Sequence, residues 1–311
     1  MKKQIFLSAL CLVFTHFFAQ NNTVEYKTKY VIVLVIDGPR YSETFGDTSC
    51  QYIPNLCGQL KENGVFYDNF RNNGPTLTVP GHTAMTTGNY QRMANNGTNL
   101  PKYPSLFQYY LFNRNAPSSD AYVISAKGKL NVLGKTKDKL WEDKNLPLTY
   151  CGPNANGITY GTDGESMKVA EKLLTSENPP HLMLLNLLAV DVWGHAANYK
   201  KYVESIVKCD EYTLKIWNLI QSNPLMKDQT TLFITNDHGR HLEGHKSGFI
   251  SHGDNCEGCR HISLLVLGPD LQKGKVVHKE GELIDLSKTI STMMNFDMPT
   301  SKGRFLEELF K

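Results

Sequence analysis

Five short runs of aliphatic and β-branched residues constrain the fold of this 311-residue chain more than any other feature. A continuous apolar run of this length is typical of a parallel strand that is buried on both faces of a sheet. The runs lie at residues 30–36, 121–125, 181–190, 230–235 and 262–267. A chain with several such strands must cover both faces of its sheet.

Helical patterns separate these runs, at residues 54–62 (closed by Gly64), 105–113, 164–174, 199–220 and 283–294. Strands that alternate with helices predict an α/β fold with a mostly parallel central sheet and helices on both faces. The stretch 130–163 is rich in Lys, Gly, Asn and Pro and is predicted to be a loop over the sheet edge.

The first 19 residues have the pattern of an export signal. Lys2 and Lys3 precede an apolar run at residues 5–18, which ends at the small residue Ala19. An uncleaved anchor is the alternative, but this run is shorter than the roughly 20 residues that span a bilayer. We therefore expect a signal peptide at residues 1–19, one α/β domain at residues 20–311, and a secreted or periplasmic protein with no membrane span after cleavage.

Composition excludes several classes of function. The formal net charge is only +3, and two of the positive charges are Lys2 and Lys3 in the predicted signal. A nearly neutral mature chain gives no electrostatic reason to expect binding to duplex nucleic acid or to an anionic membrane. The sequence identifies no protein partner.

Six cysteines remain after the predicted cleavage, and an oxidising compartment favours disulfides. Proximity in the sequence suggests the pairs Cys50 with Cys57 and Cys256 with Cys259. The second pair forms a Cys-x-x-Cys motif, which could instead be half of a zinc site or a redox pair. The absence of a second Cys-x-x-Cys from the sequence weakens the zinc interpretation.

Three of the apolar runs end in residues that bind metals. Asp37 follows the first run, Asp191 follows the third, and Asp237 with His238 follows the fourth. Open α/β sheets form their sites beyond the carboxyl ends of the strands, so these side chains are expected to meet there. His195 lies four residues after Asp191 across a glycine, and mixed carboxylate and imidazole ligands suit zinc, manganese or iron.

A hydroxyl side chain, Thr78, precedes a predicted short helix at residues 83–87. Free backbone N–H groups and the positive end of the helix dipole would favour a phosphate near such a hydroxyl. The alternative, equally supported by this motif alone, is that Thr78 only caps the helix.

Five motifs together resemble the alkaline phosphatase superfamily, and within it the nucleotide pyrophosphatase/phosphodiesterase branch and related monoesterases with a threonine nucleophile. They occur in the order of that superfamily, and the resemblance extends from residue 31 to about residue 267. They are Ile36-Asp37-Gly38, Thr78-Val79-Pro80-Gly81-His82, Asp191-Val192-Trp193-Gly194-His195, Asn236-Asp237-His238-Gly239 and Ser251-His252-Gly253.

The resemblance implies a centre with two divalent metal ions, most often zinc, that hydrolyses phosphoric esters through a phospho-threonine intermediate. Thr78 would be the nucleophile, because a metal can lower the pKa of its hydroxyl, and the two cations would stabilise the attacking and leaving oxygens. His82 would be structural. One metal would be bound by Asp191, His195 and His252, and the other by Asp37, Thr78, Asp237 and His238.

The resemblance also implies residues that bind a small phosphate-ester substrate. Lys127 matches the Lys of a Lys-x-Arg pair in the monoesterases, but Lys129 stands where Arg is expected, and Lys cannot bind phosphate in bidentate fashion. A solvated basic loop is the alternative. Asn99 fits the spacing of an asparagine that binds a phosphoryl oxygen, with Asn95 and Asn96 as rivals.

Further alternatives concern the cap and the reaction. His252 lies only 14 residues after His238, which predicts a minimal cap, and His241, His245 and His261 compete with His252 as ligands. A sulfatase would need Cys or Ser in place of Thr78. The other candidates are a phosphonate hydrolase of the superfamily, a non-catalytic metal-binding protein and a phosphate-moving mutase. Such a mutase would normally lack an export signal.

Overall fold

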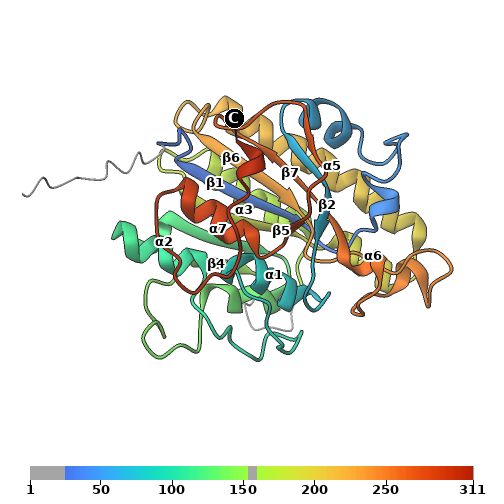
Figure 1. Cartoon of the computed structure of the whole chain (residues 1–311), viewed down its shortest axis with the longest axis horizontal. Helices are drawn as coiled ribbons and strands as arrows, with labels where there is room; N and C mark the ends of the chain where they lie inside the picture. The colour runs from blue at the N-terminus through green and yellow to red at the C-terminus, as the bar shows by residue number, and fades with distance from the viewer. Residues whose placement is uncertain (1–24, 153–159, 311) are drawn as a thin grey trace, which may run out of the picture.

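The computed structural model describes residues 25–152 and 160–310, so the predicted signal peptide lies outside the described residues. A nine-stranded sheet forms its centre in the order β4-β3-β5-β1-β6-β7-β2-β8, with β9 also paired to β2 (Figure 1). β7 runs antiparallel to both of its neighbours, and the other pairs are parallel. The strands are β1 (Tyr30–Ile36), β2 (Val65–Arg71), β3 (Ala121–Ser125), β4 (Leu148–Cys151), β5 (Leu182–Leu187), β6 (Thr230–Thr235), β7 (His261–Leu267), β8 (Lys275–Val277) and β9 (Gly281–Glu282).

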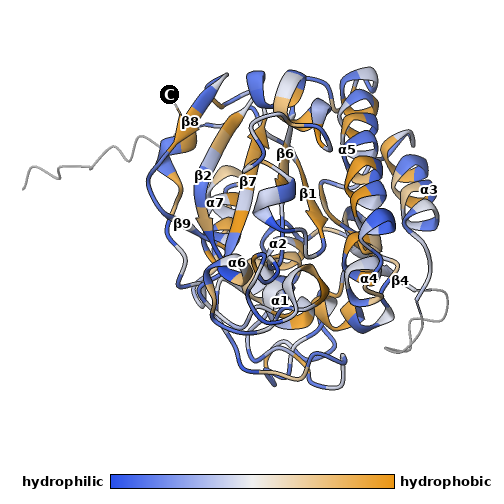
Figure 2. Ribbon diagram, turned by 90° about the vertical axis from the view of Figure 1, so that its right-hand side faces the viewer, coloured by the Kyte–Doolittle hydropathy of each residue, from blue (hydrophilic) through white to orange (hydrophobic). Residues whose placement is uncertain are grey.

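Helices cover both faces of the sheet, as expected. Side chains of α1, α2 and α7 pack with one face, and those of α3 and α5 pack with the other, where the two helices lie side by side (Figure 2). The two shorter helices are α4, which follows strand β5, and α6, which precedes strand β7. The helices are α1 (Thr78–Thr87), α2 (Leu106–Arg114), α3 (Asp163–Leu174), α4 (Ala189–His195), α5 (Tyr199–Ser222), α6 (Glu257–Arg260) and α7 (Asp285–Met293).

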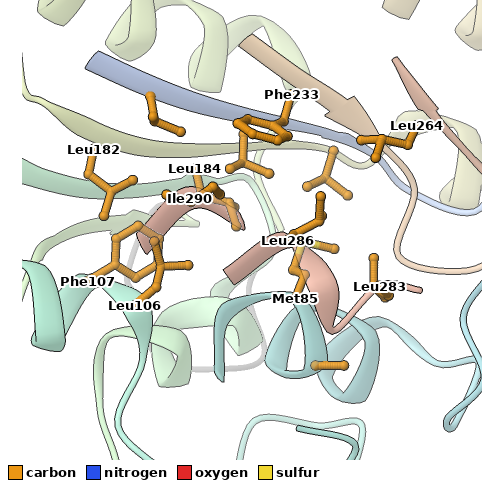
Figure 3. Close-up of a cluster of buried hydrophobic side chains, with 14 of the residues drawn as sticks. Met85, Leu106, Phe107, Leu182, Leu184, Phe233, Leu264, Leu283, Leu286 and Ile290 are labelled. Atoms are coloured by element: carbon orange, nitrogen blue, oxygen red, sulfur yellow. The ribbon is translucent and has the colours of Figure 1, made fainter. Parts of the chain in front are cut away.

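Strand β1 shows why an unbroken apolar run was needed. Val31, Val33 and Val35 belong to the core on the α1, α2 and α7 face, whereas the alternate residues belong to the core on the α3 and α5 face. Figure 3 shows part of the first core, in which Phe233 of β6 and Leu184 of β5 lie near residues of α7 and α1. Successive strand side chains point to opposite faces, so a strand buried on both sides is apolar along most of its length.

One expected strand was too long. β5 ends at Leu187, and the chain is already helical at Ala189, because the buried carboxylate of Asp163 accepts hydrogen bonds from the backbone N–H groups of Leu188 (2.7 Å) and Ala189 (3.1 Å). Burial raises the pKa of Asp163 to about 6. The prediction of a strand through residue 190 was wrong because a distant acceptor starts a helix there.

Strand β2 was not expected from the sequence. Its pairing with β7 shifts register between Tyr67 and Phe70, and the intervening Asp68 and Asn69 are partly exposed. This β-bulge interrupts the apolar alternation that predicts a strand.

The Cys50–Cys57 disulfide is confirmed, but Cys256 and Cys259 are both free thiols in the described structure, so a disulfide between them was a wrong prediction.

Other expectations can also be compared. The helix at residues 54–62 is present, with a π-helical turn at Leu56–Leu60, and residues 130–163 include a 3-10 helix (Gly128–Gly134) and the edge strand β4. Residues 153–159 of that stretch lie outside the description. Among the described residues, no helix is long and apolar enough to cross a membrane.

The C-terminal segment attaches to the sheet edge through Glu308. Its carboxylate accepts hydrogen bonds from Tyr67 of β2 (3.0 Å) and from Arg304 (2.8 Å), and it pairs with Lys279. Burial disfavours the ionised form, but the hydrogen bonds from Lys279 and Arg304 outweigh burial and lower the pKa of Glu308 to about 2.

We expect Glu308→Gln to destabilise the protein by about 1 kcal/mol at neutral pH, because Glu308 is partly exposed and solvent screens its pairs. A lowered carboxyl pKa contributes stability above the unfolded value of about 4.3, and this contribution is lost as pH falls toward the folded pKa. Urea unfolding between pH 7 and pH 3 should show the two proteins converging below about pH 4.5. Glu307→Gln, at a 76% exposed side chain, is the control and should change stability by less than about 0.5 kcal/mol. A pH-independent difference would contradict this account.

Candidate metal centre

The predicted ligands gather at the carboxyl ends of the central parallel strands. Asp37 follows β1, Asp237 and His238 follow β6, and Asp191 lies in α4, which follows β5. Strand β1 is the neighbour of both β5 and β6, so the three carboxylates leave adjacent strands. Helices α1 and α4 lie toward this end of the sheet (Figure 2).

One group of side chains has the spacing of a tetrahedral metal site. Asp191 Oδ1 lies 3.3 Å from His195 Nε2 and 3.4 Å from His252 Nε2, and the two imidazole nitrogens are 3.0 Å apart. Ligand atoms at about 2.0 Å from a zinc ion would lie roughly 3.3 Å from one another. His252 Nδ1 lies 2.9 Å from the carbonyl oxygen of Thr76, a contact that turns Nε2 toward the group.

A second group is fully buried and lacks partners. Asp37 Oδ1, Asp237 Oδ2 and His238 Nε2 have no hydrogen-bond partner in the described part of the chain. His238 Nε2 lies 3.3 Å from Asp237 Oδ2 and 3.6 Å from Asp37 Oδ1. Buried polar atoms without partners are costly, and a cation between them would satisfy all three. These residues therefore fit a divalent metal, and the unpaired atoms are the observation that supports it.

The charges of the centre explain the pKa shifts of its carboxyl groups. Burial first, and then the negative charge of Asp237, raise the pKa of Asp37. Burial also acts to raise the pKa of Asp191, but Lys127 and hydrogen bonds from two histidines outweigh burial and hold the pKa well below its usual range. Burial lowers the pKa of His238, so its ring is neutral and Nε2 keeps the lone pair that a metal needs.

Lys127 joins the two groups. Its ammonium group lies 2.8 Å from Asp37 Oδ2 and 2.6 Å from Asp191 Oδ2, and the side chain is fully buried. Lys127 therefore takes one oxygen of each carboxylate and leaves the other oxygen facing the histidines. The attraction of the two carboxylates outweighs burial, which alone would lower the pKa of Lys127, and raises it. The ammonium also lies 3.5 Å from Thr78 Oγ1.

Thr78 is the first residue of α1 and lies one residue after the N-cap. The N-cap is Leu77, which has no side chain that can accept a hydrogen bond, so the capping alternative for Thr78 is wrong. The helix is also longer than the expected 83–87, because Pro80 fits the first turn of a helix, where its missing N–H costs nothing. Thr78 Oγ1 thus lies beside Lys127 with no capping role.

The other predicted substrate contacts are placed less directly. Asn95, one of the two rivals of Asn99, accepts a hydrogen bond from the backbone N–H of Val79 (2.8 Å), next to Thr78. Asn99 accepts from the backbone of Ala94 (3.1 Å) and lines a separate surface groove with Lys102.

Lys129 is buried near the centre. Burial and then the charge of Lys127 lower its pKa, against the attraction of the three carboxylates of the centre. The roles of Asn99, Lys127 and Lys129 in substrate binding stay predictions.

His82 fits the structural role expected for it. It lies close to Asp37 and Asp237, but its Nδ1 is 2.9 Å from the carbonyl oxygen of Thr78, and its Nε2 is 3.2 Å from Asn186 Nδ2. The neutral tautomer that donates from Nδ1 and accepts at Nε2 satisfies both partners, so no lone pair remains for a metal.

Sequence reasoning missed two residues of the centre, Asn186 and Arg240. Asn186, at the end of β5, donates to Asp37 Oδ2 (3.1 Å). Arg240 is fully buried and donates to the backbone oxygens of Gly38 (2.8 Å) and Asp191 (2.8 Å) and to the Asp191 carboxylate. The available signal in the sequence was the position of Arg240 directly after Asp-His-Gly. An arginine that is buried next to such residues is rarely without partners.

Motif glycines allow these close approaches. A Cβ atom at Gly194 would lie 2.6 Å from Arg240 Cζ, and one at Gly81 would lie 2.5 Å from the carbonyl oxygen of Asp237. Gly38 has a φ of +61°, and a Cβ atom there would lie 2.7 Å from His238. The glycine positions of the motifs are therefore contact points between the segments that hold the ligands.

Comparisons with known proteins match part of this chain to a metalloenzyme family. A family model of the metalloenzyme superfamily matches residues 145–298. The 2,3-bisphosphoglycerate-independent phosphoglycerate mutase of Legionella pneumophila (strain Lens) is 28% identical over 164 residues, which cover 50% of this chain and 30% of the mutase. The match thus spans less than a third of the mutase.

Solved structures show the same fold at low identity. A protein of the alkaline phosphatase superfamily from Vibrio parahaemolyticus has a TM-score of 0.63 at 14% identity, covering 91% of this chain and 71% of that chain. Murine ectonucleotide pyrophosphatase/phosphodiesterase 5 has a TM-score of 0.63 at 16% identity, covering 91% and 100%. A phosphonate monoester hydrolase from Silicibacter pomeroyi has a TM-score of 0.65 at 13% identity, covering 91% and 76%.

We expect His252→Asn to remove one of the predicted metal ligands and to weaken binding of a divalent metal by at least roughly 10²-fold. Metal titration monitored by thermal unfolding measures this, because a metal at 100 times its Kd adds about 2.7 kcal/mol to stability. His245→Asn is the matched control, since the His245 side chain is 45% exposed in the same loop. Equal metal stabilisation in both variants would remove His252 from the ligand set.

We expect Gly194→Ala to push Arg240 away from Asp191 and to destabilise the metal-free protein by about 2 kcal/mol. Urea unfolding in the presence of a chelator measures this without the contribution of metal. Gly164→Ala in α3 is the control: a Cβ atom there meets no atom nearer than 3.8 Å, and the change should leave stability unchanged or raise it by up to about 1 kcal/mol. Similar effects of the two changes would show that Arg240 needs no glycine partner.

Proposed function

The chain belongs to the alkaline phosphatase superfamily of metalloenzymes, and we propose that it is an exported hydrolase of phosphoric esters with two divalent metal ions. The observation that carries the proposal is the position of Thr78. Its hydroxyl begins α1 beside Lys127, whose ammonium group contacts one carboxylate from each predicted metal group. A nucleophile beside the side chain that joins the two predicted cation sites suits in-line phosphoryl transfer, in which two metals can stabilise the attacking and leaving oxygens.

In the proposed reaction Thr78 acts as a covalent nucleophile. When bound, the two metals, which we take to be zinc, would supply charge stabilisation for the attacking and leaving oxygens. Thr78 Oγ1 gives up its proton to solvent and bonds to phosphorus, while the bond from phosphorus to the leaving oxygen breaks and that oxygen takes a proton from solvent to become the alcohol. Water then cleaves the phospho-threonine, which releases inorganic phosphate from a monoester and restores the hydroxyl.

The chain's own charges suit an anionic substrate. Three buried carboxylates face two buried cations, Lys127 and Arg240, so two divalent ions would make the centre clearly positive. Lys127 holds its carboxylates beside Thr78, and Lys129 is a further basic side chain nearby. This excess of positive charge favours phosphate esters over neutral esters.

Export and the substrate class are parts of the same proposal. The Cys50–Cys57 disulfide is compatible with an extracellular protein, in agreement with the predicted signal at residues 1–19. An inactive form of the murine phosphodiesterase was solved in complex with AMP, which supports a small phosphate ester as the substrate of this chain. The match to a phosphoglycerate mutase supports one second candidate, transfer of the phosphoryl group to a sugar-acid hydroxyl.

We expect Thr78→Ala in the zinc-loaded protein to lower kcat/KM for p-nitrophenyl phosphate and bis-p-nitrophenyl phosphate by at least roughly 10²-fold, because the nucleophile is lost. Thr83→Ala on the same helix is the control, since the Thr83 hydroxyl has no hydrogen-bond partner among the residues described. Acid quenching followed by mass spectrometry should detect phosphate on Thr78 in the parent protein.

The other outcomes separate the candidates. Full activity of Thr78→Ala would contradict the covalent mechanism. A strong preference for the monoester would support Lys127 and Lys129 as phosphate ligands, and a preference for the diester would argue against that role. Phosphoglycerate isomerisation without net release of phosphate would support the mutase, and a metal-loaded protein that turns over none of these substrates would support a binding protein.

A further inference from the structure

A second cluster of metal-binding side chains lies outside the proposed catalytic centre. His241, Asp254, Cys256 and Cys259 each offer a ligand atom, and these four atoms all lie within 4.8 Å of one another. In a tetrahedral zinc site the ligand atoms are about 3.3 to 3.8 Å apart, so only small side-chain movements separate this cluster from such a site.

His241 provides an independent observation that points to a ligand. Its side chain is 4% exposed, and neither ring nitrogen has a hydrogen-bond partner in residues 25–152 and 160–310. Its Nε2 lies 3.3 Å from Asp254 Oδ2. A buried imidazole without partners is costly unless an ion or another group completes it.

The backbone holds the cluster in place. The Gly239 N–H donates to the carbonyl oxygen of Cys259 (2.9 Å), and a Cβ atom at Gly239 would lie 2.1 Å from the carbonyl oxygen of Gly258. This close approach brings His241, two residues later, to the Cys-x-x-Cys turn. Asp254 Oδ1 accepts from the N–H of Cys256 (3.0 Å), which leaves Oδ2 directed at the other ligands.

We propose that His241, Asp254, Cys256 and Cys259 bind a structural zinc ion. Two thiolates, one imidazole and one carboxylate select zinc over calcium or magnesium, and four protein ligands make a closed site with no position for substrate. Lys246, which pairs with Asp254, is 56% exposed and is free to move into solvent when the ion binds.

The zinc would connect the two halves of the loop between β6 and β7. His241 lies three residues after His238, and Asp254 lies two residues after His252. An ion shared by His241 and Asp254 therefore fixes the spacing between ligands of the two predicted catalytic metals. The ion takes no part in the hydrolysis itself. Binding of zinc at this site can therefore be tested whether or not the chain hydrolyses phosphate esters.

Cobalt substitution distinguishes this site from the catalytic centre. Thiolate ligands give cobalt(II) an intense charge-transfer absorption in the near ultraviolet, and the proposed catalytic ligands contain only oxygen and nitrogen. We expect this absorption in the cobalt-loaded full chain, its loss in Cys256→Ser and Cys259→Ser, and its retention in Asp37→Asn and His245→Asn. We also expect Cys256→Ser to retain one zinc ion fewer per chain than the parent protein.

Three results would overturn the proposal. The first is no such absorption in the cobalt-loaded parent protein, and the second is an unchanged absorption in Cys256→Ser. Cys256 is partly exposed, so Cys256→Ser is expected to fold even if Cys259→Ser, at a buried thiol, does not. The third is mass spectrometry of the alkylated, unreduced protein that finds Cys256 and Cys259 joined by a disulfide. Cys209→Ser, at a buried thiol of α5, is a further control and should keep the absorption.

Discussion

Three carboxylates buried at one edge of the sheet are the constraint on which the rest of this structure depends. Asp37, Asp191 and Asp237 leave adjacent strands, so their negative charges are forced together where water cannot screen them. Lys127 and Arg240 neutralise part of this charge and donate hydrogen bonds to carboxylate oxygens of Asp37 and Asp191. The remaining unpaired oxygens make the site a place for cations, and they give the phosphate ester hypothesis its physical basis.

Close packing of the backbone carries this constraint into the fold. The glycines of the motifs lie where one segment with predicted ligands touches another, so these segments pack this closely only because Cβ atoms are absent. Asn186 and His82 extend the arrangement below the carboxylates: Asn186 donates to Asp37, and His82 joins Asn186 to the first turn of α1. The helix with the proposed nucleophile is thus tied to β5, whose Asn186 contacts the proposed ligand Asp37.

The sequence predicts the parallel centre of the fold well, because a strand buried on both faces is apolar along most of its length. It predicts the strands on the β8 side of the sheet poorly: β2 contains the polar bulge at Asp68 and Asn69, and β8 and β9 are only three and two residues long. The ligand set followed from residues at strand ends and from the resemblance, whereas Arg240 and Asn186 act through contacts with residues distant in sequence. A pattern of single residues cannot reveal such contacts, and the helix start at Ala189 was missed for the same reason, since its cap Asp163 is 26 residues away.

The loop between β6 and β7 shows how a ligand can be positioned without a hydrophobic core. Residues 242–247 of this loop are exposed, yet His252 near its end must stay fixed beside Asp191. Polar links do this: Arg240 donates to the carbonyl oxygen of Ile250 (3.0 Å), and the His241 N–H donates to that of Ser251 (3.1 Å). Because Arg240 also binds Asp191, the same side chain sets the distance between the loop and the opposite ligand. A metal ion bound at His241 and Asp254 would add the one element that these hydrogen bonds lack, a link that water cannot easily replace.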